Sequence, residues 1–128
     1  MLIEQPDSQQ LILVSPILPG RVEAWRRFVQ DMSEGQSEAY AASRSRMHIQ
    51  AERLWINETA DGAIAVLVIE ADHPDVALQA LATSQHPFDR WFRQQVLALL
   101  GHDLNRSSFR LAPDLLADYR SQPPDPLP

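Results

Sequence analysis

The chain has 128 residues, of which 45% are hydrophobic and 22% charged, a composition typical of one globular domain rather than of a disordered or collagen-like chain. The net charge of −6 is unfavourable for sequence-independent binding to nucleic acid, so we expect no nucleic-acid partner. The absence of cysteine excludes disulfides, thiolate metal sites, iron–sulfur clusters and cysteine nucleophiles.

The apolar segments are too short to predict a membrane protein. The longest, residues 11–14 and 63–69, are far below the roughly 18 residues that span a bilayer. The first residues have no basic stretch followed by an apolar one, so no secretory signal is predicted. All 11 basic residues are arginine, which is typical of GC-rich bacterial genomes. We therefore expect a cytoplasmic bacterial protein with no membrane partner.

One domain is predicted between two loose ends. Residues 1–10 are polar and contain Pro6, which indicates a flexible N-terminal segment. Residues 121–128 contain four of the ten prolines, so this tail is expected to form neither helix nor sheet. The domain is therefore expected to occupy residues 11–120.

The first elements of the domain are a strand and two helices. Residues 11–18 are apolar and rich in β-branched side chains, which predicts a buried strand. In residues 21–32, apolar side chains recur every three or four positions, which predicts a helix with one buried face. Residues 33–37 break this pattern. Ser37 is a suitable N-cap for a second helix over residues 38–47.

A hairpin is predicted next. Residues 52–58 alternate between polar and apolar side chains, as a half-buried strand does. Asp61-Gly62 then supplies a strong hairpin turn. Residues 63–71 follow as the most strand-like run in the chain.

The second half of the domain predicts further helices and a last strand. Residues 72–75 start a helix, with a polar cap and proline at the first helical position. Residues 84–87 interrupt it, and a second apolar stripe then continues until Gly101 ends the helix. Residues 108–112 are expected to form a short strand and residues 114–120 a short helix. The apolar stripes of the helix that ends at Gly101 and of the helix over residues 21–32 place five aromatic residues in the core: Trp25, Phe28, Phe88, Trp91 and Phe92.

This order of elements is that of a ferredoxin-like βαββαβ sandwich, an α+β fold with one antiparallel sheet and helices on one face. Residues 11–14 and 63–69 are nevertheless apolar on both faces of their strands. Because leaving such side chains in water is unfavourable, we expect a second copy of the chain to cover the open face. The predicted assembly is a homodimer with its sheets packed face to face.

Several segments also carry a family resemblance. They are the first strand with Pro19-Gly20 before a helix, residues 52–56 (ERLWI), Asp61-Gly62, the strand over residues 65–70, residues 84–92 (SQHPFDRWF) and residues 101–104 (GHDL). Through them the region from Leu11 to Tyr119 resembles the dimeric α/β-barrel superfamily, which includes antibiotic-biosynthesis-type monooxygenases and many small bacterial proteins. The resemblance implies the fold and the dimer more than any chemistry, because such folds carry unrelated functions.

Patterns for metal or cofactor binding are absent. No two histidines are spaced two or four residues apart, as neighbouring metal ligands on a strand or helix would be. The four glycines are isolated, so there is no glycine-rich phosphate loop. We therefore expect neither a metal nor a cofactor, and we place His102 just beyond the end of a helix.

Arg44 and Arg46, with Arg53 nearby, are the main concentration of basic charge. An anionic ligand is one interpretation of this cluster. A solvated helix end, where arginine complements the helix dipole, is the interpretation that we prefer.

The candidate ligand-binding residues are His48, Arg53, Trp55, Glu70 and His86. Arg53 and Trp55 share one face of a strand, where they line either a small-molecule pocket or the dimer interface. Glu70 ends an apolar strand. It is a proton acceptor with a raised pKa if it points inward, or a strand-end carboxylate if it lies at the rim, which we prefer.

Three functions stay open. The first is a homodimer that binds a small organic ligand between sheet and helices. The second is a cofactor-independent monooxygenase or related proton-transfer enzyme acting on an aromatic or enolisable substrate. The third is a structural or regulatory partner protein without a pocket. A cavity of about 300 Å³ or more with convergent polar side chains would favour the first two.

Overall fold

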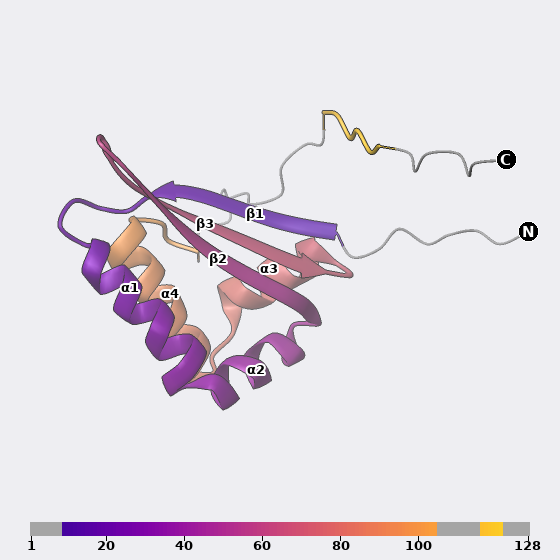
Figure 1. Cartoon of the computed structure of the whole chain (residues 1–128). Coiled ribbons are helices and arrows are strands. Elements are labelled where there is room, and N and C mark those ends of the chain that lie inside the picture. The colour runs from indigo at the N-terminus through magenta and orange to yellow at the C-terminus, as the bar shows by residue number, and fades with distance from the viewer. Residues whose placement is uncertain (1–8, 105–115, 122–128) are drawn as a thin grey trace, which may run out of the picture.

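A computed structural model describes residues 9–104 and 116–121 of the chain. Within these residues the fold is α+β: three strands form one antiparallel sheet, and all the helices lie on one side of it (Figure 1). The elements, in chain order, are β1 (Gln9–Pro16), α1 (Val22–Gln30), a π-helical turn (Asp31–Gly35), α2 (Ser37–Arg46), β2 (Ile49–Thr59), β3 (Gly62–Ala71), α3 (Pro74–Thr83) and α4 (Pro87–Leu100).

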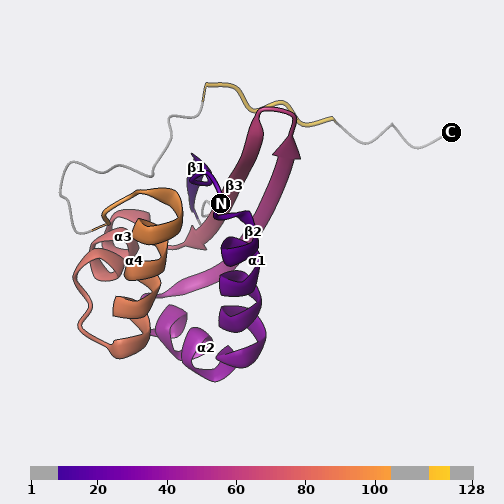
Figure 2. The same cartoon turned by 90° about the vertical axis from the view of Figure 1, so that its left-hand side faces the viewer.

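The central strand of the sheet is β3, which pairs antiparallel with β1 on one side and with β2 on the other. Leu67 of β3 lies opposite Leu13 of β1 and Leu54 of β2. The predicted hairpin is confirmed, but its two turn residues are Ala60 and Asp61 rather than Asp61 and Gly62, because Gly62 pairs with Thr59 as the first residue of β3. The hairpin extends past the helices (Figure 2). The chain therefore crosses from β1 to β2 through α1 and α2, with β3 filling the place between those strands.

The two faces of the sheet differ in exposure. Alternate residues of β1 and β3, such as Leu11, Leu13 and Leu67, face the helices and are buried. The residues between them point to the opposite face, which no described element covers. On that face Val14 is 61% exposed and Trp55 50% exposed. We call this surface the open face; its apolar members are Ile12, Val14, Trp55, Ile64, Val66 and Val68.

The helix layer is packed through aromatic side chains, as the sequence predicts. Phe28, Phe88 and Phe92 are all buried, and so is Trp25, whereas Trp91 is only half-buried. The ring centroid of Phe28 lies 5.2 Å from the ring centroids of Trp25 and Trp91 and 5.9 Å from that of Phe92. These tilted contacts join α1 to α4 beneath the sheet.

The predicted break after the first helix is instead a π-helical turn. The Gln36 amide donates to the Asp31 carbonyl at 2.8 Å, five residues back, and the Gln36 side chain also donates to the Asp31 carboxylate. The chain therefore continues without a loop from α1 into the π-helical turn, and Gln36, at φ −122° and ψ 37°, separates that turn from α2. Ser37 is the first residue of α2 rather than its N-cap, and Gln36, which holds the N-cap position, makes no capping side-chain bond.

Helix ends are confirmed in part. Pro74 and Pro87 each begin a helix, and Gly101 ends α4 in the left-handed conformation at φ +79°. No side chain caps α3, in contrast to the expected polar cap. His102 follows the end of α4, as predicted, and its Nε2 lies 2.8 Å from the buried Ser15 hydroxyl.

The remaining differences concern the ends of the domain. Strand β1 begins at Gln9, two residues before the predicted start, because Gln9 and Gln10 continue the pairing with β3. The predicted helix over residues 114–120 is wrong for its described part, since residues 116–120 are not helical. The predicted strand over residues 108–112 lies outside the described residues.

Candidate functional site

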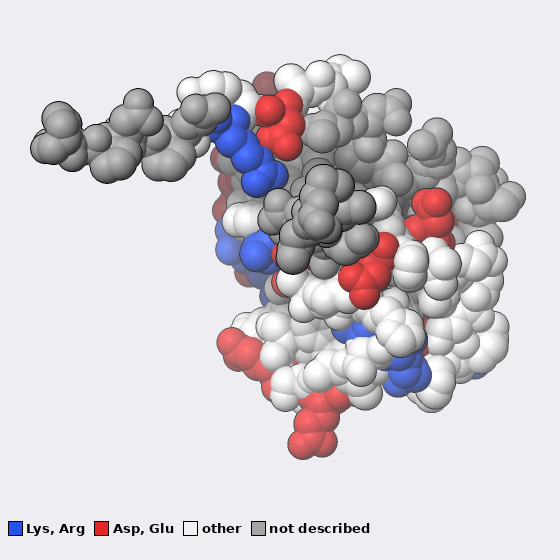
Figure 3. All heavy atoms as spheres, turned by 90° about the vertical axis from the view of Figure 1, so that its right-hand side faces the viewer, with Lys and Arg blue, Asp and Glu red and all other residues white. Residues whose placement is uncertain are grey.

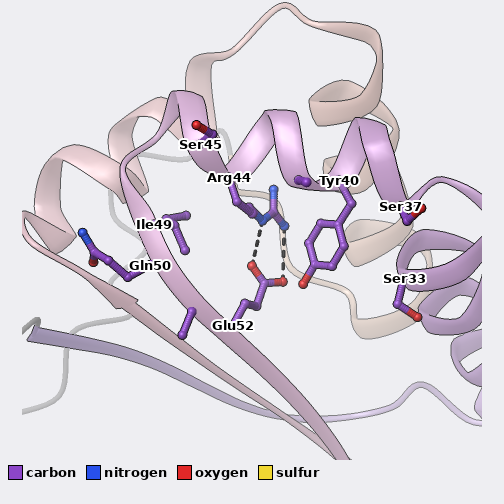
Figure 4. Close-up of a pocket in the computed structure, with 10 residues that line it drawn as sticks. Ser33, Ser37, Tyr40, Arg44, Ser45, Ile49, Gln50 and Glu52 are labelled. Carbon is purple, nitrogen blue, oxygen red and sulfur yellow. Dashed lines mark hydrogen bonds and ion pairs between the residues drawn. The ribbon is translucent and has the colours of Figure 1, made fainter.

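A cleft of about 420 Å³ lies between α2 and the start of β2 (Figure 4). One wall is a single face of α2, because its lining residues recur at helical spacing from Ser37 to Ser45. The other wall is the first part of β2, from Ile49 to Glu52. The complete lining consists of Ser33, Ser37, Tyr40, Ala41, Arg44, Ser45, Ile49, Gln50, Ala51 and Glu52.

A buried ion pair joins the two walls. The Arg44 guanidinium donates from Nε to Glu52 Oε1 at 2.7 Å and from Nη2 to Oε2 at 3.4 Å. The side chains of Arg44 and Glu52 are 7% and 3% exposed. The guanidinium also lies 4.5 Å from the ring centroid of Phe92 and 5.1 Å from that of Tyr40. Arg44 is therefore held by Glu52 and Tyr40 in the walls of the cleft and by Phe92 from the core.

Tyr40 brings a hydroxyl to the same place. Its ring stacks on Phe88 with centroids 6.1 Å apart, and its hydroxyl is directed toward Glu52 (Figure 4). Burial, and next the negative charge of Glu52, raise the pKa of Tyr40 above its ordinary value. The phenol therefore stays protonated at neutral pH and serves as a hydrogen-bond donor.

A second polar cluster lies behind the ion pair and fixes α2. Arg44 Nη1 donates to Ser43 Oγ at 2.9 Å, and Ser43 donates in turn to Asp89 Oδ1 at 2.5 Å. The other oxygen of Asp89 accepts from Ser84 at 2.5 Å and from Arg46 at 2.9 Å. Burial of Asp89 would raise its pKa, but these hydrogen bonds outweigh burial and hold the pKa below its usual value. The carboxylate therefore ties α2 to the start of α4.

The five residues predicted from the sequence lie in three separate places. Arg53, Trp55 and Glu70 are on the open face, where Arg53 and Glu70 form an ion pair of 3.4 Å. His48 is exposed in the turn between α2 and β2, at φ +56°. His86 is exposed immediately before α4. The structure thus brings together three of the five, and none of the five lines the cleft.

Sequence reasoning missed Tyr40 and Glu52, and it placed Arg44 in solvent, which is wrong. Arg44 is buried because Phe88 and Phe92, more than 40 residues away in the chain, pack against its guanidinium. One signal was available: Arg44 and Glu52 are opposite charges on two consecutive elements joined by a tight turn, which places them close enough to pair.

The rest of the described structure offers no charged patch, metal-ligand group or membrane-spanning helix that would extend this site. On the face in Figure 3, acidic and basic side chains are interspersed, and neither kind covers a continuous area. Among the described residues, no three histidine, aspartate or glutamate side chains are grouped to hold a metal ion. No helix in the described part of the chain is both long and apolar enough to cross a membrane.

Comparisons of the chain with protein-family models, with curated proteins and with solved structures found no match. The function must therefore be inferred from the geometry of the cleft and of the open face.

Proposed function

We propose that this chain is a ligand-binding protein that holds a small organic molecule in the cleft between α2 and β2. The observation that carries the proposal is the convergence of Tyr40, Arg44 and Glu52 in a cleft of about 420 Å³. Ligand clefts in proteins commonly have volumes of about 300–1,000 Å³ and combine apolar walls with a few polar groups that orient the ligand. Ala41, Ile49 and Ala51 supply the apolar part of these walls.

The buried ion pair supports a role in recognition. A buried ion pair is weak evidence for stability, because desolvation of both charges offsets much of their attraction. Its position between the two walls of the cleft is instead suited to holding α2 and β2 at a fixed spacing, so that Tyr40 is presented to a ligand in one place. The pair is neutral overall and Tyr40 is protonated, so an uncharged ligand with hydrogen-bonding groups matches this surface best.

Binding is favoured over catalysis by the same residues. The alternative of a monooxygenase or proton-transfer enzyme requires a base near the ligand. The raised pKa of Tyr40 makes its phenol a poor base at neutral pH, and the Glu52 carboxylate is occupied by Arg44. Glu70, the carboxylate considered for this role from the sequence, lies away from the cleft and pairs with Arg53.

The same proposal includes a homodimer of the ferredoxin-like type. The strand order β1-β3-β2 and the crossover from β1 to β2 support the ferredoxin-like assignment. The open face supports the dimer, because its apolar residues lie side by side on neighbouring strands and a two-fold interface would bury this patch against its own copy. Trp55 at its margin is of a type that is enriched in interfaces.

The ligand-binding proposal is tested by screening a library of small uncharged organic compounds for protein-observed NMR shifts. We expect hits to shift the backbone amides of Tyr40, Ala41 and Gln50. Tyr40→Phe should weaken those hits at least tenfold, because it removes the hydroxyl that lies beside Glu52 in the wall of the cleft. Tyr119→Phe, at an 88% exposed position, is the matched control and should leave their affinity unchanged. Hits that bind Tyr40→Phe as well as the unaltered protein would contradict the proposal.

A further inference from the structure

The cleft lies against the edge of β2 rather than against either face of the sheet. Four consecutive residues of this strand, from Ile49 to Glu52, line it. Successive side chains of a strand point to opposite faces, so a cavity on one face would touch only every second residue. Here Glu52, opposite Ile69, points toward the helices, and Ala51, opposite Glu70, points to the open face. A cavity that touches both must therefore lie beside the strand.

This edge of β2 has no strand neighbour among the described residues. β2 pairs only with β3, on its other side. The edge of a sheet presents unpaired backbone N–H and C=O groups and is a template for another extended chain. The register between β2 and β3 shifts at Gln50, between Ile49 and Ala51, so the strand is bulged where it borders the cleft. Such bulges are frequent next to binding sites.

We propose that the ligand of the cleft is a short extended peptide, which pairs with the free edge of β2 as an added strand. This inference rests on the proposed function and names the chemical class of the ligand. Addition of a strand to a sheet edge is a common mode of peptide recognition, in which backbone hydrogen bonds supply affinity and adjacent pockets supply specificity. Here α2 forms the second wall of the groove.

The lining residues define the chemistry of the peptide. Ser37, Ala41 and Ser45 of α2, with Ala51 of β2, are small and leave room for a passing backbone. Arg44 and Glu52 neutralise each other, and Tyr40 is protonated. A charged side chain at this point would compete with one member of the ion pair. The peptide is therefore one that presents an uncharged hydrogen-bonding side chain, such as serine, threonine, asparagine or glutamine, to the Tyr40 hydroxyl.

The experiment uses the full chain and a pool of capped pentapeptides with one of these four residues at the centre and valine or threonine elsewhere. Binding is measured by NMR titration, followed by amide hydrogen exchange. The best peptide is then made in two N-methylated forms, one methylated at its odd-numbered residues and the other at its even-numbered residues. We expect the amide protons of β2 at the cleft to exchange more slowly when the peptide is bound. We also expect one of the two N-methylated forms to bind at least tenfold more weakly, because only alternate N–H groups of the peptide face the strand.

Two variants of α2 test the place of binding. Ala41→Trp fills the groove and should weaken binding of the best peptide at least tenfold. Ala39→Trp makes the same change at an exposed position of α2 outside the cleft and should leave binding unchanged. If both N-methylated forms bind as well as the parent, or if no peptide binds while small organic compounds do, the peptide inference fails and the ligand-binding proposal stands. If neither peptides nor compounds shift any amide at the cleft, both fail.

Discussion

Disruption of the ion pair between Arg44 and Glu52 tests whether the two walls of the cleft are held together as described. Arg44→Met leaves the Glu52 carboxylate, 3% exposed, without its cationic partner. Removing one member of a buried pair typically costs about 3–5 kcal/mol, because the remaining charge is neither solvated nor neutralised. We expect a loss of unfolding free energy in that range.

Glu52→Gln should lower the free energy of unfolding by a smaller amount, about 2–3 kcal/mol. The guanidinium then keeps the hydrogen bond to Ser43 and its contacts with the rings of Tyr40 and Phe92. The double variant leaves no buried charge at this point. Its loss should therefore be smaller than the sum of the two single losses by about 2 kcal/mol or more.

The assay is urea denaturation at one fixed protein concentration, followed by circular dichroism. The chain supplies a matched control in the pair Arg26–Glu58, which is joined at 2.6 Å but has side chains 47% and 58% exposed. Arg26→Met and Glu58→Gln should show a coupling of at most about 1 kcal/mol. A coupling between Arg44 and Glu52 no larger than this control would refute the inference that burial makes the pair important.

Three further expectations follow from burial and charge. Phe92→Ala should lower the free energy of unfolding, measured by urea denaturation, by about 3–5 kcal/mol, whereas Leu97→Ala, at a 49% exposed position of the same helix, should lower it far less. Equal losses would contradict the assigned helix face. Because the pKa of Asp89 is lowered by folding, its carboxylate contributes stability that is present above its unfolded pKa and is lost as pH falls through the folded pKa. Asp89→Asn should therefore lower stability at neutral pH and weaken its decline on acidification, and an unchanged pH profile would be evidence against the Asp89 network. Leu67→Asp should unfold the monomer, since Leu67 is 4% exposed, whereas Val66→Asp on the open face should convert a dimer to a folded 14.5 kDa monomer in light scattering. A monomeric unaltered protein would disprove the dimer.

Periodicity was sufficient to predict the three strands of the sheet and the main helices, together with the faces that they bury. Phe28 and Phe92 were placed in the core because apolar residues around them recur at helical spacing, and both are buried. The β2–β3 hairpin followed from alternation and from Asp61-Gly62. These features depend on residues close together in the chain, which is why one sequence contains enough information to predict them.

The cleft depends on contacts that local patterns do not encode. The burial of Arg44 is caused by rings of α4, and the partners of Asp89 come from α2 and from the segment before α4. The π-helical turn was likewise hidden, because the residues around Gly35 show a loss of helical periodicity that a loop would also give. Sequence reasoning therefore identified charged residues near the site but not which of them were enclosed.

The attachment of α2 to Asp89 has a consequence for how fast a ligand can bind. Ser43 and Arg46 secure this helix to a carboxylate that is completely buried, and Arg44 secures it to β2. A hinge movement of α2 would have to break several of these bonds at once. The cleft is therefore shaped before any ligand arrives, and the protein itself incurs little cost of conformational ordering on binding. Association should follow a single rate that rises linearly with ligand concentration, without the plateau that a slow opening step would impose.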